Sequence, residues 1–233
     1  MKFAKLQADF LILAIAASSS LLASTARAHE QGDWIVRAGS ATVSPSGSSG
    51  LISAAATGAL AGTSVEVADD TQLGLTIAYM LTDNVGIELL AATPFEHSIQ
   101  ARGLSAYGFN TTDLGSAKHL PPTFVAQYYF FNSSSSVRPY LGLGLNYTAF
   151  FSEDLTGFAE NELAADNLKL DDSFGVAWQL GIDWQISERY LLNASVWNLD
   201  IDTEAKFDSA LGQVSVNVDI DPWVYMVGIG YKF

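Results

Sequence analysis

Hydrophobic residues alternate with small or polar residues in eight separate segments of this chain. Successive side chains of a β-strand point to opposite faces, so a period of two predicts a strand with one apolar face. Residues 173–186 show the pattern most clearly, with Phe174, Trp178 and Leu180 on one face and Gln179 and Asp183 on the other. The eight predicted strands are residues 34–43, 71–81, 85–95, 123–131, 139–151, 173–186, 190–201 and 223–233.

The last segment has the profile of a strand that crosses a lipid bilayer. Every second residue back from Phe233 to Trp223 is aromatic or branched, and the aromatic residues sit at both ends of that face. Membrane strands place aromatic girdles at both interfaces and aliphatic residues between them. A terminal aromatic residue is also typical of outer-membrane barrels, so we predict that Phe233 contacts the barrel-assembly machinery.

The connections between the predicted strands alternate in length. Short turns at residues 82–84, 132–137 and 187–189 separate long polar stretches at 44–70, 96–120, 152–172 and 202–219. Outer-membrane barrels have short periplasmic turns, longer outside loops and an even strand count. We therefore predict an all-β fold: an eight-stranded antiparallel transmembrane β-barrel with four long extracellular loops and three short periplasmic turns. We expect residues 44–62 to form a flexible loop and residues 160–168 to form a short helix.

The first residues have the features of a secretory signal peptide. Lys2 and Lys5 precede an apolar run at residues 10–17, and Ala26-Arg27-Ala28 fits the small-x-small cleavage pattern. A membrane anchor is the alternative, but the apolar run is short for a spanning helix. We predict a signal peptide at residues 1–28 and a single barrel domain at residues 29–233, integral to the outer membrane of a Gram-negative bacterium.

Composition agrees with a barrel. The chain is 49% hydrophobic, yet beyond the first residues no stretch approaches the roughly twenty apolar residues of a spanning helix. The formal net charge of −14 argues against nucleic acid as a partner. A soluble lipocalin-like barrel is the alternative, but small residues on the non-apolar faces suit a narrow interior better than a solvated exterior.

Several blocks of the chain resemble the OmpW family of outer-membrane proteins. The blocks are residues 37–43 (RAGSATV), 71–76 (TQLGLT), 83–95 (DNVGIELLAATPF), 119–123 (HLPPT), 138–140 (RPY) and 195–203 (SVWNLDIDT). The resemblance runs through nearly all of residues 29–233. It implies an eight-stranded barrel with a narrow, largely apolar channel that passes small hydrophobic compounds across the outer membrane.

Strand parity predicts which residues line the lumen. Glu88 should face inward because a carboxylate on the lipid face is destabilising, and Leu90 shares its face. Inward parity with polar neighbours also selects Met80, Trp197 and Leu199. We predict that these four apolar residues line the lumen, and the family resemblance favours a constriction or gate formed by Leu90 and Trp197, since apolar constrictions dewet and exclude ions. The alternative is that they only pack the interior of a small barrel.

Pro94 falls within the third predicted strand. Proline cannot donate a hydrogen bond to the ladder, so pairing should weaken there. We predict a lateral exit into the membrane beside Leu90. The alternative is that Pro94 marks the outer end of the strand.

Other chemistry has weak support. His97 and His119 lie at the two ends of the second long loop, without a metal-ligand spacing or a nucleophile motif, and loop histidines are usually solvated. We predict no metal, no cofactor and no catalytic residues. The expected partners are outer-membrane lipid, lipopolysaccharide and small hydrophobic solutes. The alternatives to a channel are a structural or receptor barrel that acts through its loops, or a lipid-modifying barrel enzyme.

Overall fold

The structure is a computed structural model that describes residues 29–109 and 112–233. The predicted signal peptide at residues 1–28 lies outside the described residues. Strands dominate the described part of the chain, which also contains the helix α2 (Gly157–Glu162) and a 3₁₀ turn, η1 (Leu104–Tyr107). The expected helix at 160–168 therefore begins earlier and is shorter. None of the described helices is long and apolar enough to cross a membrane.

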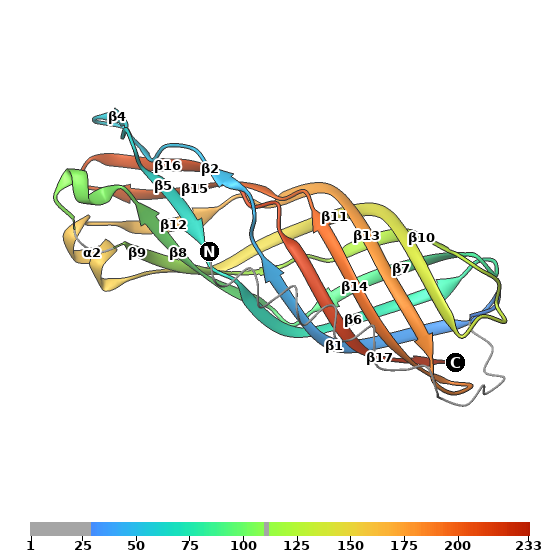
Figure 1. The fold of residues 1–233 in the computed structure, drawn as a ribbon. Coiled ribbons are helices and arrows are strands. Elements are labelled where there is room, and N and C mark those ends of the chain that lie inside the picture. The colour runs from blue at the N-terminus through green and yellow to red at the C-terminus, as the bar shows by residue number, and fades with distance from the viewer. Residues whose placement is uncertain (1–28, 110–111) are drawn as a thin grey trace, which may run out of the picture.

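Eight long strands form the wall of a closed barrel. They are β1 (Trp34–Ser44), β6 (Asp70–Met80), β7 (Val85–Ala92), β10 (Thr123–Tyr129), β11 (Val137–Leu155), β13 (Ser173–Gln185), β14 (Tyr190–Leu199) and β17 (Trp223–Lys232). Each pairs antiparallel with the next one in this order, and β1 pairs with β17 (Figure 1). The predicted eight-stranded antiparallel barrel is confirmed. The end of the barrel that carries the short connections is called the turn end, and the opposite end is called the loop end.

The first and last strands close the wall along a regular seam. Their register runs from Ile35 opposite Lys232 to Ser44 opposite Trp223. Gly39 faces Gly228 midway, and a Cβ atom on Gly39 would collide with the backbone carbonyl of Val227. The seam therefore needs glycine at this point so that the two backbones can approach closely.

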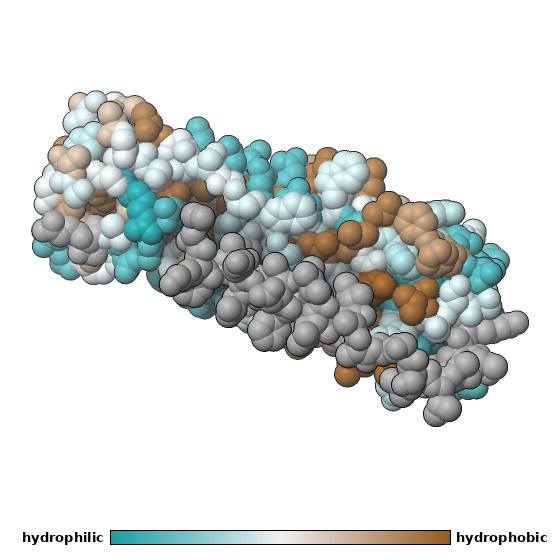
Figure 2. Space-filling model, in the orientation of Figure 1, coloured by the Kyte–Doolittle hydropathy of each residue, from teal (hydrophilic) through white to brown (hydrophobic). Residues whose placement is uncertain are grey.

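Burial alternates along the wall strands as the sequence predicted. On β13 the side chains of Phe174 and Trp178 are 69% and 61% exposed, whereas Gln179 and Asp183 are buried. The apolar side chains therefore form an outward band, part of which Figure 2 shows as brown patches on the right-hand half of the molecule. An outward apolar band around a closed barrel is the surface that lipid requires.

The long connections continue the wall beyond the membrane band at the loop end (Figure 1). One sheet joins the outer part of β11 to β9 (Asp113–Leu120), β8 (Phe95–Arg102) and β5 (Ser64–Val67). A second sheet contains β12 (Asp166–Leu170), β15 (Asp202–Ser209), β16 (Gly212–Asp219), β2 (Ser48–Ser49), β3 (Ser53–Ala54) and β4 (Gly58–Ala59). The expectation of a flexible loop at residues 44–62 was wrong, because β2 and β3 pair with β16. The two sheets enclose a second apolar core that includes Ile99, Leu168 and Val216.

Candidate functional site

A buried ion network around Arg37 of β1 fills the turn-end half of the lumen. The guanidinium contacts Glu88 of β7 (Nη1–Oε2 2.6 Å) and Asp183 of β13 (Nη2–Oδ2 2.5 Å, Nε–Oδ1 3.1 Å). All three side chains are buried. Buried charges are tolerated when they are paired and hydrogen-bonded, and this network joins strands on different sides of the wall.

Side-chain amides satisfy the remaining acceptors of the two carboxylates. Gln179 donates to Glu88 (2.7 Å), and Asn193 donates to Asp183 (2.8 Å). Gln127 in turn donates to Gln179 (2.8 Å). The network therefore reaches five strands of the barrel and spans its cross-section.

Below the ion network, at the turn end, an apolar layer and the start of the described chain complete the closure. The layer consists of Ile35, Ala78, Met80, Tyr129, Tyr140 and Leu191. The His29 imidazole contacts Asp183 (Nε2–Oδ2 2.8 Å), and Arg138 donates to the backbone carbonyl of His29 (2.9 Å). The ion network and this layer together fill the lumen at the turn end.

Above the ion network lies an apolar cluster that brings together three of the four predicted lumen residues, including both predicted gate residues, Leu90 and Trp197. Leu90, Trp197 and Leu199 belong to this cluster, and each is at least 96% buried. Met80 does not join them: it pairs with Gly86, below the level of Glu88, whereas Leu90 lies above that level. Parity identified the inward face for all four residues but carries no information on depth.

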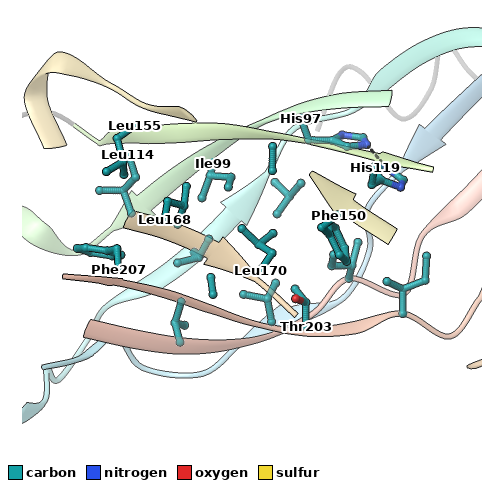
Figure 3. A pocket seen from close by; sticks show the side chains of 18 of the residues that line it. His97, Ile99, Leu114, His119, Phe150, Leu155, Leu168, Leu170, Thr203 and Phe207 are labelled. Atoms are coloured by element: carbon teal, nitrogen blue, oxygen red, sulfur yellow. Dashed lines mark hydrogen bonds between the residues drawn. The ribbon is translucent and has the colours of Figure 1, made fainter. Parts of the chain in front are cut away.

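A narrow apolar cavity, called the tunnel, adjoins this cluster on its loop-end side, and Figure 3 shows the side chains that line it. Val43, Ile201 and Phe150 belong both to the cluster around Trp197 and to the tunnel wall. The tunnel has about 50 Å³ of free volume, and a wider cavity of about 620 Å³, called the mouth, lies next to it. Leu114 and Phe207 line both spaces, so the tunnel and the mouth lie side by side.

The two loop histidines meet in the wall of the tunnel. Phe95 pairs with His119 across β8 and β9, and the Nε2 atoms of His97 and His119 lie 2.9 Å apart (Figure 3). Each histidine is only 5% exposed, so the expectation of solvated loop histidines was wrong. Burial lowers the pKa of His119 to about 3 and also lowers the pKa of His97, so both rings are neutral near pH 7.

The ladder between β7 and β10 is interrupted beside Leu90. Pairing ends at Leu90 opposite Thr123 and resumes between β8 and β9 at Phe95 opposite His119. Between these points residues 91–94 and 120–122, which contain Pro94, Pro121 and Pro122, do not pair with each other, although Ala91 and Ala92 still pair with β6 and Leu120 still pairs with β11. The placement of Pro94 within a strand was wrong, because it lies between β7 and β8. Proline lacks the N–H that a ladder needs, which accounts for the interruption.

The sequence reasoning missed the charges that close the lumen. Arg37, Asp183 and Arg138 are buried inside the barrel, although each carries a charge. Asp183 has inward parity on the clearest strand, and Arg37 lies among small residues on the first strand. A basic residue on a membrane strand, with acidic residues at inward positions of other strands, would have identified the ion pairs.

Comparison with known proteins decides the family. A sequence profile of the OmpW family matches residues 30–233. The chain belongs to the OmpW family. Over 226 residues it is 45% identical to outer membrane protein W of Vibrio cholerae, covering 95% of this chain and 98% of that one. The identity to outer membrane protein W of Escherichia coli is 46% over 224 residues, covering 96% and 99% of the two chains.

A solved structure supports the same assignment for this OmpW-family protein. The crystal structure of the outer membrane protein OprG from Pseudomonas aeruginosa aligns with a TM-score of 0.84 and 44% identity. The alignment covers 88% of this chain and 98% of OprG. The OmpW-family protein is therefore an integral barrel of the outer membrane of a Gram-negative bacterium, as predicted.

Proposed function

We propose that this OmpW-family protein is a channel through which small hydrophobic molecules enter from outside the cell and leave sideways into the outer membrane. One observation carries the proposal: the apolar lining of the tunnel adjoins the cluster of Leu90 and Trp197, which lies above a lumen filled by the Arg37 ion network. A solute that reaches the cluster finds apolar contacts on one side and buried charges on the other.

The chemistry of the path favours apolar cargo. Among the residues that line the tunnel, only His97, His119 and Thr203 are polar. An ion would lose its hydration there without compensating partners, whereas each Å² of apolar surface removed from water contributes about 25 cal/mol. Apolar constrictions also dewet, which disfavours ion flow.

The interrupted ladder supplies the exit. Ala91, Pro94 and Pro121 border the unpaired part of the wall, next to Leu90 in the chain and in space. Apolar cargo moving outward through this gap enters the lipid that surrounds the barrel. The same arrangement leaves the ion network undisturbed, because no part of this route crosses Arg37.

The proposed partners follow from the surface. Outer-membrane lipid covers the apolar band, and lipopolysaccharide surrounds its loop-end rim. Phe233 is 72% exposed at the turn end, where its backbone N–H donates to the carbonyl of Trp34 (2.9 Å). We propose that the barrel-assembly machinery recognises this exposed aromatic ring.

Two alternatives remain as outcomes of the test. An enzyme needs a nucleophile activated by a base. Among the residues that the structure describes, neither His97 nor His119 hydrogen-bonds a hydroxyl group, which disfavours this alternative. A receptor or structural barrel would act through its loops without passing solute.

The test is uptake of an apolar fluorescent dye by cells with and without the protein, and by cells carrying Leu90→Asp. We expect cells with the native protein to take up the dye faster than cells without it. Uptake with Leu90→Asp should be near background, because an unpaired carboxylate inside the apolar cluster disfavours the passage of apolar solutes. Equal uptake in all three strains would exclude the channel and favour a role for the loops. Cleavage of acyl or peptide bonds that is lost on His119 substitution would favour the enzyme.

A further inference from the structure

His97 and His119 form a polar pair in the otherwise apolar lining of the tunnel. Thr203, the third polar side chain of the lining, already donates from Oγ1 to the carbonyl of Asp171 (2.7 Å). His97 and His119 stand in the part of the tunnel wall that contacts the Trp197 cluster, because Phe95 of that cluster stacks on His119 with ring centroids 5.5 Å apart. Cargo that follows the proposed route passes these rings before it reaches the gate.

The position of each proton on the pair follows from the contacts. The carbonyl of Ala68 lies 2.5 Å from Nδ1 of His97 and can only accept, so Nδ1 carries the hydrogen. Nε2 of a neutral His97 is then an acceptor. It faces Nε2 of His119 at 2.9 Å, so the His119 Nε2 atom is the donor.

This placement of the hydrogen atoms leaves one acceptor nitrogen of the pair without a hydrogen-bond partner. Nδ1 of His119 has a bare lone pair, is buried, and has no hydrogen-bond partner among the described residues. A buried acceptor without a partner is destabilising, and a ligand that donates a hydrogen bond to it recovers that loss. Phe95 and Phe150 flank the ring, with centroids 5.5 and 5.7 Å from that of His119, and offer apolar contact to the rest of such a ligand.

We infer that the tunnel contains a selective subsite at Nδ1 of His119, which binds neutral, mainly apolar molecules that carry one hydrogen-bond donor, such as aliphatic alcohols. The inference rests on the proposed channel and specifies its cargo. An alcohol donates to the imidazole nitrogen while its alkyl chain contacts the apolar side chains of the tunnel, which move apart to admit it because the free volume is only about 50 Å³. An isomeric ether has the same atoms and nearly the same shape but has no proton to donate.

The test compares 1-decanol with its isomer methyl nonyl ether on the full-length barrel in lipid nanodiscs. Displacement of a bound apolar dye measures the affinity of each isomer. One net hydrogen bond corresponds to about a fivefold preference for the alcohol. We expect this preference in the native protein, its loss in His119→Phe, and its retention in the matched control Thr203→Val, which removes the other polar group of the lining.

Each outcome decides between the two proposals. Dye displacement by both isomers with no preference in the native protein overturns the subsite but leaves the channel in place. A preference that survives in His119→Phe overturns the assignment to His119. Failure of the dye and of both isomers to bind overturns the channel itself.

A second measurement uses only the native protein, in case His119→Phe does not fold. Nitrogen-15 NMR of the His119 ring reports on hydrogen bonds to Nδ1. We expect the Nδ1 resonance to shift upfield on addition of 1-decanol and not on addition of the ether. Equal responses to the two isomers would overturn the subsite.

Discussion

Arg37 and Glu88 form a 2.6 Å ion pair between strands that are not neighbours in the wall. β6 lies between β1 and β7, so the pair passes over its inward face. Asp183 holds the other side of the guanidinium from β13, three strands away in the opposite direction. The lumen is therefore braced across its width by one side chain.

The first prediction concerns this brace. Arg37→Met leaves the carboxylates of Glu88 and Asp183 buried without their cation, and breaking a buried pair in this way costs about 3–5 kcal/mol. We expect the free energy of unfolding, measured by urea titration in lipid vesicles, to fall by that amount. The control is Arg102→Met, which removes a solvent-exposed pair with Glu66 and should lower the free energy of unfolding far less than Arg37→Met does. Equal small losses in both variants would show that the network does not brace the barrel.

The second prediction separates the apolar cluster from the ion network. Trp197→Ala removes a large buried side chain, which costs about 3–5 kcal/mol and leaves a cavity. We expect bulkier apolar dyes to enter cells that carry this variant. Ion conductance in planar bilayers should stay at the native level, because the Arg37 network still fills the lumen below. If Trp197→Ala conducts ions and the native protein does not, the barrier to ions lies at the Trp197 cluster.

The third prediction addresses the lateral exit. Pro94→Ala restores a backbone N–H at the interrupted ladder, which allows the wall to pair further. We expect dye uptake to fall several-fold while the barrel remains folded on heat-modifiability gels. Pro139→Ala is the matched control, since Pro139 lies within β11 and away from the interruption. Native uptake by Pro94→Ala would mean that cargo leaves by another route.

The fourth prediction is a pH dependence of the loop-end extension. The pKa of His119 is about 3 in the folded protein and near 6.5 when the chain is unfolded, so the unfolded state binds the proton more tightly. The contribution of neutral His119 to stability is full above pH 6.5 and is lost progressively as the pH falls toward 3. We expect the melting temperature to drop by several degrees between pH 7 and pH 5.

His119→Phe provides the comparison for this pH dependence. The phenylalanine cannot bind a proton, so the slope of melting temperature against pH should become shallower in that interval. Carboxylates titrate mainly below pH 5, which keeps their effect largely out of the comparison. An unchanged slope in His119→Phe would remove His119 as the cause.

The strands of the wall could be predicted because lipid outside and a narrow lumen inside impose a strict period of two. The third strand was predicted too long, and its true end at Ala92 reflects the proline that follows. The strands of the extension were missed because long connections were read as loops. Val214, Val216 and Val218 alternate in one of these stretches and carried the signal.

The candidate site could be predicted only as far as parity allows. Parity identified Leu90 and Trp197 as inward, but depth separates Met80 from them. The contact between His97 and His119 depends on the β8–β9 register, which places Phe95 opposite His119. Such a register follows from pairing across a hairpin and not from local sequence, so this contact lay beyond prediction.

The seam between β1 and β17 has a consequence for biogenesis. Its ladder joins Ile35 to Lys232, which stand at opposite ends of the barrel sequence, so the wall closes only after all other strands are in place. Before that moment both outer strands present unpaired N–H and C=O groups, which hydrocarbon cannot satisfy. A partly inserted intermediate therefore needs another protein edge to cover β1 and β17 until they meet.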